Sequence, residues 1–319
     1  MSKKFIVGPS PHILGAKSVS SIMWDVVISL IPVTLVAILF FGVSALMVLA
    51  ASTLSAMLFE ALVLTLGAKK FDPKFLLSDG SAAVTGLLVG LILPPAAPIW
   101  LAIIASATAI LLAKHAFGGI GNNIFNPALV GRALVFMSWP VIMTRWHLPL
   151  GVENWFTRLG ADVATGATPL GGADATLLEM FLGNIGGSLG ETSAVAILLG
   201  GIYLFLKGHI DWRIPGGYIG TAAIFALVTN QFSLEAVAFH LLAGGLLFAA
   251  VFMATDMVTS PTTKTGRLLF GIGCGLVTMF IRVYASAPEG VTYAILFMNA
   301  LVPLIDRYTV PRTFGEVRK

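Results

Sequence analysis

One short string near the middle of the chain carries the residues best suited to chemistry. It runs Asp162-Val163-Ala164-Thr165-Gly166-Ala167-Thr168-Pro169. Pro169 disfavours a helical conformation at Thr168 and therefore predicts an extended, accessible threonine. Its hydroxyl is a candidate acceptor for a covalent group attached by a modifying enzyme. From the residues alone, a polar loop turn with no further role is the favoured explanation.

The other reactive side chains are scattered along the chain. The five histidines show no i, i+3 or i+4 pairing, and the one cysteine, Cys274, lies in an apolar run. A structural metal site needs several ligands at close spacing, and an iron–sulfur cluster needs about four thiolates. No phosphate-binding loop or nucleophile motif is present. The sequence therefore predicts no catalytic residue and no metal site.

The composition excludes an ordinary soluble enzyme. Of the 319 residues, 57% are hydrophobic and 11% are charged, and the mean hydropathy is +0.93. Soluble domains carry about 25% charged residues. Long apolar runs favour membrane helices over the alternating pattern of an outer-membrane barrel. The net charge of +4 gives no indication of a nucleic-acid partner.

About ten segments are long and apolar enough to cross a bilayer as helices, which need roughly 20 residues each. The segment that contains Pro94-Pro95 is short and is expected to be a broken helix. The expected spans are residues 22–42, 43–66, 82–96, 97–113, 126–144, 192–207, 216–231, 236–254, 266–284 and 291–307.

The basic residues predict the orientation of these spans. Fifteen of the 19 lysines and arginines fall on the side of the two termini, Lys114 among them, and two fall on the other side. His115, beside Lys114, is expected to be a loop charge on the side of the termini. Basic loops face the cytoplasm, so both termini are expected there. The predicted parts are a cytoplasmic lead with five helices (1–144), an outer loop (145–191), and five further helices with a short tail (192–319).

The two halves share short similar strings. Asp79-Gly80-Ser81 and Asp256 each precede a Thr-Gly pair, and the strings around Asn126 and Asn299 are alike. Five crossings per half make the second half inverted relative to the first, and inverted repeats place binding sites at their interface. Chance similarity between glycine-rich helices is the alternative.

Several of these motifs resemble a known family. The pattern Asp162-x-x-Thr165-Gly166-Ala167-Thr168 resembles the flavin-attachment site of the D subunit of the Rnf ion-translocating electron transport complex. The B subunit of the Na+-translocating NADH:quinone reductase has a similar site. The further matching strings are Ser78-Asp79-Gly80-Ser81, Leu93-Pro94-Pro95, Gly118-Gly119-Ile120-Gly121-Asn122-Asn123, Phe125-Asn126-Pro127-Ala128 and Asp256-Met257-Val258-Thr259-Ser260-Pro261.

The resemblance implies an all-α, polytopic membrane protein of about ten helices in two five-helix inverted repeats, similar to urea transporters. It implies FMN bound to Thr168 as a phosphoester, with Asp162, Thr165, Gly166 and Ala167 forming the attachment motif. A second, noncovalent flavin such as riboflavin is compatible with it. The implied function is electron relay in a ferredoxin:NAD oxidoreductase complex coupled to Na+ or H+ transport.

The implied partners are the other membrane subunits, an outer FMN-bearing subunit, cytoplasmic iron–sulfur and NADH-type subunits, a flavin transferase and membrane lipid. The implied location is the cytoplasmic membrane of a bacterium or archaeon, with the flavin loop outside. Two alternatives remain at this point. One is the quinone-reductase B subunit, which typically has a longer N-terminal part, and the other is a urea-transporter-like channel for a small neutral solute.

Polar residues inside the expected spans are the remaining candidates. Arg132 and Arg282 could contact flavin, and Asn122 and Asn126 could bind the edge of its ring, although asparagine beside glycine or proline often stabilises turns. Asp79 and Asp256 are candidates for an ion path, with a helix-capping role as the alternative. For Asp25 and Glu60 we favour a structural ion pair or a helix-end position.

Overall fold

The chain folds into a bundle of helices. The computed structural model describes residues 18–68, 79–149, 166–285 and 290–311, and these ranges contain no β-strand. The first group comprises α1 (Val19–Ala68), α2 (Ser81–Leu91), α3 (Ile99–Ala107), α4 (Pro127–Ser138) and α5 (Pro140–Met143). After the short α6 (Leu177–Leu182), the second group comprises α7 (Ala194–Lys207), α8 (Arg213–Thr229), α9 (Leu234–Leu242), α10 (Leu246–Phe248), α11 (Lys264–Tyr284) and α12 (Val291–Thr309).

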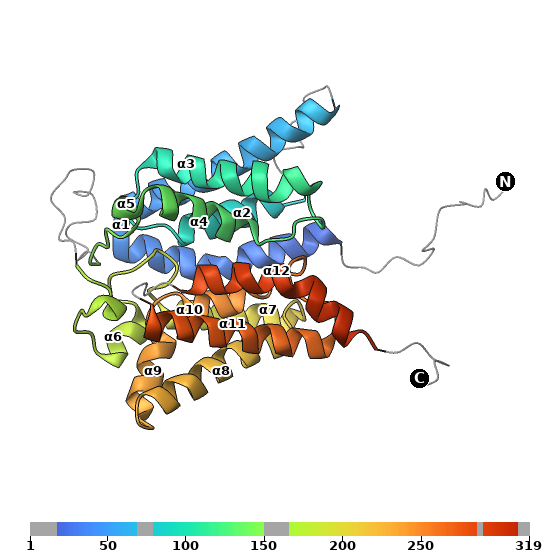
Figure 1. Cartoon of the computed structure of the whole chain (residues 1–319). Coiled ribbons are helices and arrows are strands. Elements are labelled where there is room, and N and C mark those ends of the chain that lie inside the picture. Colours follow the sequence, from blue (N-terminus) through green and yellow to red (C-terminus); the bar gives the residue numbers. More distant parts are fainter. Residues whose placement is uncertain (1–17, 69–78, 150–165, 286–289, 312–319) are drawn as a thin grey trace, which may run out of the picture.

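The two groups lie against each other (Figure 1). α1 packs on α7, and α4 packs on α12. α1 begins and α12 ends at the same end of the bundle, whereas α5 and α6 lie at the opposite end (Figure 1). The expected all-helical fold is confirmed, and α6 marks the end at which the middle segment of the chain lies.

α1 is two antiparallel helices joined by a sharp turn. Its 50 residues would extend about 75 Å as one rod, which is more than twice the hydrocarbon thickness of a bilayer. At Gly42 the backbone leaves the helical region, with φ 63° and ψ −150°, and the chain turns back (Figure 1). The expected spans 22–42 and 43–66 are these two arms.

The outer surface of the bundle is apolar in the manner of a lipid-facing surface. Leu54, Leu58, Leu62 and Leu66 recur at every fourth residue of α1, and 50–69% of each is exposed. Residues four apart share one face of a helix, so these side chains form a continuous leucine stripe. A stripe of this kind would be unfavourable in water and is typical of a helix that contacts lipid.

By length and apolar composition, three of the described helical segments are long enough to cross a membrane: α1, residues 99–117 and α11. A fourth is obtained if α9 and the segment after it count as one bent span. The other expected spans coincide with shorter or less apolar helices, α2, α4, α7, α8 and α12. The chain is thus a multi-pass membrane protein, and the number of ten crossings stays a prediction.

Two helices are broken inside the bundle. α2 is an 11-residue helix that stops before Pro94-Pro95, as the sequence predicts. The second break was not predicted: the expected span 236–254 bends by 67° between α9 and the segment Leu246–Met253. Gly244, with φ 65°, occupies the break, where a side chain would be strained.

Two stretches of π-helix follow α3 and α10. They are η2 (Thr108–Lys114) and η7 (Ala249–Met253), and η2 leads into the 3-10 turn η3 (His115–Phe117). π-Helical turns are rare and are often found at functional sites. Nothing in the apolar pattern of these segments predicts them.

A pair of buried asparagines joins the two groups of helices. The Asn126 side chain caps α4 by accepting from the backbone N–H groups of Ala128 (3.0 Å) and Leu129 (3.3 Å). Its Nδ2 donates to the Met253 carbonyl (3.2 Å), and its backbone N–H donates to Asn299 Oδ1 (3.2 Å). The two asparagines with similar surroundings in the sequence are therefore in contact in the fold.

Replacing Asn126 by alanine is expected to destabilise the bundle. Loss of the helix cap costs about 1 kcal/mol, and the Met253 carbonyl, left buried without the Asn126 Nδ2 donor, adds about 1–3 kcal/mol. Thermal unfolding in detergent checks this. The matched control is Asn122→Ala, because Asn122 is exposed and bonds only within its own turn, to the Gly118 carbonyl. Equal melting temperatures for the two variants would contradict the structural role of Asn126.

Candidate functional site

Thr168 begins a short turn at the α6 end of the bundle. It is extended, with φ −76° and ψ 162°, which confirms the conformation predicted from Pro169. The 3-10 turn η6 (Pro169–Gly171) follows it, and the Gly171 N–H donates to Thr168 Oγ1 (3.2 Å). Thr168 is partly exposed. Its hydroxyl oxygen is thus held in place by the backbone and not covered by the bundle.

The residues before Thr168 are fitted closely to their surroundings. The Gly166 N–H donates to the Trp146 carbonyl (3.1 Å), and a Cβ at Gly166 would lie 2.9 Å from the side chain of Leu148. Ala167 is exposed. Asp162 and Thr165, the other two residues of the expected attachment motif, lie outside the described residues. A larger residue at position 166 would displace the extended segment that carries Thr168.

Thr168 lies at the edge of a trough lined by charged side chains. Two adjoining pockets form this trough, which we call the Thr168 trough, and they share Leu170, Glu191 and Gly244. Thr168 lines the first pocket, and Arg132 and Arg282 line the second. Two guanidinium groups and one carboxylate therefore face a space that begins at the threonine.

The arginines of the trough are held by short contacts. Arg132 Nη1 donates to Glu191 Oε1 (2.8 Å) in an ion pair whose side chains are 6% and 7% exposed. Arg282 donates from Nη1 to the His240 carbonyl (2.7 Å) and from Nη2 to the Ala243 carbonyl (3.0 Å). These bonds fix the guanidinium planes, so the positive charge of the trough is preorganised.

Two glycines allow close packing around the charged groups of the trough. A Cβ at Gly245 would lie 2.6 Å from Glu191 Oε1, and a Cβ at Gly244 would lie 2.8 Å from Leu170 Cδ1 and 3.2 Å from Arg282 Nη2. A side chain at either position would therefore displace Glu191, Leu170 or Arg282. The charges of the trough suit an anionic group, because arginine recognises phosphate and other anions.

α6, which lies next to this region, begins with a capping box. The Thr176 N–H donates to Glu179 Oε2 (2.9 Å), and the Glu179 N–H donates to Thr176 Oγ1 (3.3 Å). The bonds from the backbone N–H and then from the hydroxyl of Thr176 lower the pKa of Glu179 from its usual value. The carboxylate stays charged and favours the start of the helix.

A larger cavity lies at the other end of the bundle. It holds about 820 Å³ of empty space, part of it open to solvent, and we call it the inner cavity. Most of its lining is apolar, and its polar lining comprises Ser81, Thr85, Lys114, Asn123, Asn126, His209, Thr255 and Asp256. Asp256 accepts from Thr259 Oγ1 (3.0 Å) within its own turn. Both groups of helices contribute to this cavity.

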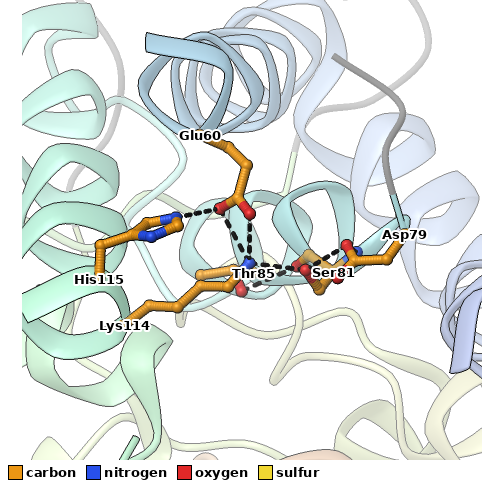
Figure 2. A network of polar contacts seen from close by, with 6 residues as sticks. All are labelled: Glu60, Asp79, Ser81, Thr85, Lys114 and His115. Carbon is orange, nitrogen blue, oxygen red and sulfur yellow. Dashed lines mark hydrogen bonds and ion pairs between the residues drawn. The ribbon is translucent and has the colours of Figure 1, made fainter. Parts of the chain in front are cut away.

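A network of charged groups borders the inner cavity (Figure 2). Lys114 Nζ donates to Glu60 Oε1 (2.9 Å) and Oε2 (2.8 Å) and to Ser81 Oγ (2.6 Å). The Ser81 hydroxyl donates to Asp79 Oδ1 (2.5 Å), and His115 Nε2 lies 2.9 Å from Glu60 Oε2. Four ionisable side chains are thus linked through α1, the start of α2 and the end of η2.

The structure separates the expected site residues into two places. Arg132 shares the Thr168 trough with Thr168, whereas Asn126 lines the inner cavity and Asn122 is exposed in a turn. Asp256 lines the inner cavity, and Asp79 binds Ser81, which also lines it. The two asparagines expected beside the FMN ring are therefore not at the trough.

Two charged residues of these regions, Glu191 and Lys114, were not predicted as site residues. Glu191, in the segment expected to be an outer loop, is buried beside Arg132. His115 beside Lys114 was expected as a loop charge, and this is wrong, because His115 Nε2 lies 2.9 Å from Glu60 Oε2. Lys114 is also bound to Glu60, and its side chain is 3% exposed. The one available signal was Glu60 itself, since a carboxylate inside an apolar span needs a partner.

No group of three or more His, Cys, Asp or Glu side chains is placed to hold a metal ion within the described ranges.

The chain is similar to proteins of known complexes along almost its whole length. It is 42% identical to the D subunit of the proton-translocating ferredoxin:NAD(+) oxidoreductase complex of Clostridium ljungdahlii, over 98% of this chain and 97% of that one. It is also 42% identical to the D subunit of the Na(+)-translocating ferredoxin:NAD(+) oxidoreductase complex of Acetobacterium woodii, over 98% and 96% of the two chains. The identity to the D subunit of the ion-translocating oxidoreductase complex of Escherichia coli is 34%, over 98% and 99%.

The family model for NQR2, RnfD and RnfE matches residues 6–315. The match includes all of the helices described above and both the Thr168 trough and the inner cavity. The chain therefore belongs to the NQR2, RnfD, RnfE family.

Proposed function

We propose that this chain is the D-type membrane subunit of an Rnf-type ferredoxin:NAD oxidoreductase complex and carries FMN as a phosphoester on Thr168. The names of its relatives, and the share of both chains over which they are similar, support its membership of such a complex. The observation that carries the flavin proposal is the position of Thr168, whose hydroxyl lies at the edge of a trough lined by two fixed guanidinium groups. Flavins transfer one or two electrons, which suits a relay.

Several residues of the chain would hold the cofactor, each in a different way. Asp162, Thr165, Gly166 and Ala167 present Thr168 to a flavin transferase. Arg132 and Arg282 supply positive charge to an anionic cofactor, and Glu191 orients Arg132. Gly244 and Gly245 let Arg282 and Glu191 lie close to the backbone of the trough.

The proposal includes an orientation in the membrane. The distribution of basic residues favours cytoplasmic termini, and α1 begins and α12 ends opposite α6 (Figure 1). Thr168 would then lie on the outer side of the cytoplasmic membrane, in a body of two five-helix inverted repeats. Electrons from a cytoplasmic donor would need partner subunits with their own redox groups, because one cysteine holds no cluster.

A second, noncovalent flavin would have room in the inner cavity, which has an apolar lining with a few polar groups. Asn126, Asp79 and Asp256 lie at or beside this cavity and would act there, on the flavin or on the ion path, and not at the trough.

Replacing Thr168 by valine is expected to abolish covalent flavin, because valine has the same shape but no hydroxyl. The chain is coexpressed with a flavin transferase and viewed for flavin fluorescence after denaturing electrophoresis. Thr176→Val is the matched control, since Thr176 is a neighbouring exposed threonine with a capping role. If the wild-type band shows no flavin fluorescence although the transferase is active on another substrate, the covalent attachment of flavin is refuted. A channel for a neutral solute is then favoured.

Charge changes in the trough are expected to shift the flavin potential in opposite directions. Arg132→Gln removes a positive charge and destabilises the electron-rich reduced form, so the two-electron midpoint potential falls by about 30 mV or more, equivalent to about 1.4 kcal/mol. Glu191→Gln removes the paired negative charge and raises the potential. Redox titration of the flavin-loaded chain measures both.

Breaking a buried pair costs about 3–5 kcal/mol, so each variant is first checked for covalent fluorescence and normal elution. Shifts of the same sign in the two folded variants, or no shift in either, would place the flavin away from this ion pair.

A further inference from the structure

The network beside the inner cavity contains buried charged groups. Glu60 and Lys114 have side chains 5% and 3% exposed, and an uncompensated charge in such a place is unfavourable. A proton that one of these groups gives up is therefore expected to be passed to a neighbouring group or replaced.

The groups of the network form a chain from the surface to the cavity. The His115 side chain is 14% exposed, which is more than the side chains of Glu60 (5%) and Lys114 (3%). One hydrogen bond joins His115 Nε2 to Glu60 Oε2, and the next joins Glu60 Oε1 to Lys114 Nζ. Lys114 in turn lines the inner cavity. Each step has the length over which a proton can be transferred directly.

The local helix geometry brings consecutive residues to the same carboxylate. In a regular α-helix, neighbouring side chains point about 100° apart, so Lys114 and His115 would not share a partner. Here the π-helix η2 ends at Lys114 and the 3-10 turn η3 begins at His115, and both side chains reach Glu60 (Figure 2). A simple structural ion pair would require only one of them.

Ser81 and Asp79 hold the end of the chain in position. Ser81 Oγ accepts from Lys114 Nζ and donates to Asp79, so it fixes the ammonium at the cavity wall (Figure 2). The other titratable groups that line the inner cavity are His209 and Asp256. His209 is engaged by Asp25 (2.8 Å) and Asp256 by Thr259, so neither competes for Glu60.

We propose that His115, Glu60 and Lys114 form a proton-transfer chain between the protein surface and the inner cavity. The Lys114 ammonium passes a proton to the Glu60 carboxylate, which passes it to Nε2 of the neutral His115 ring, and the ring releases its Nδ1 proton to surface water. Water in the cavity then protonates the Lys114 amine. One proton enters, one leaves, each residue regains its charge, and no electron moves.

The test follows the Lys114 ammonium protons in the full chain in detergent, labelled with 15N-lysine, by their exchange with water in NMR spectra. In the wild type, we expect fast exchange, because the His115 ring accepts the proton through Glu60 as a general base. His115→Gln keeps a hydrogen-bonding side chain but does not titrate. We expect it to slow exchange at neutral pH by roughly tenfold or more and to leave only the dependence on hydroxide.

His240→Gln is the matched control, because His240 lies in α9 and takes no part in the network. Lys114→Arg identifies the signal, and His115→Asn repeats the test if His115→Gln does not fold. If fast exchange removes the Lys114 signal in the wild type and the signal reappears in His115→Gln, the proton-transfer chain is supported. Equal exchange in the wild type and the folded His115 variants would overturn it, since the Lys114 ammonium would then lose its protons directly to cavity water. The outcome does not depend on the flavin.

Discussion

The requirement that every buried charge be paired determines the arrangement of this bundle. Its helices are apolar on all sides, so hydrophobic packing alone would permit many registers. Few of these registers bring Arg132 to Glu191, 59 residues away, and also bring Glu60 to Lys114, 54 residues away. Each pair is buried, and breaking either would leave a charge without compensation, which is far more costly than a shift of leucine against leucine. The ion pairs therefore define the positions of α4, η2 and the turn before α7.

The same requirement explains why the interior contains broken helices. A helix that stops inside the bundle leaves backbone groups to be satisfied, and the chain uses them to join distant segments. The end of α2 accepts from the segment before α7 through the Leu91 and Leu93 carbonyls, and the start of α4 is joined to η7 and α12 through Asn126. The interruptions are thus the places where the two groups of helices are connected.

The apolar runs of the sequence predicted the helices, and Pro94-Pro95 and Pro169 predicted a break and an extended threonine, because these effects are local. The bend at Gly244 and the two π-helices were missed, since their causes are contacts with other helices. Thr168 could be predicted because its motif is continuous in sequence. Glu191 and Lys114 could not be placed, because their partners lie more than 50 residues away and no local pattern encodes such a pair.

α4 is the element that relates the two polar regions. Asn126 at its start lines the inner cavity, and Arg132 lines the Thr168 trough, six residues or about 9 Å further along the helix axis. In the proposed arrangement, a redox group at the trough and a proton carrier at the cavity would be separated by less than two turns of one short helix. Electrostatic coupling over such a distance is strong in an apolar interior, whereas it would be screened in water. The placement of α4 would then provide a physical basis for linking electron transfer at the trough to proton movement at the cavity.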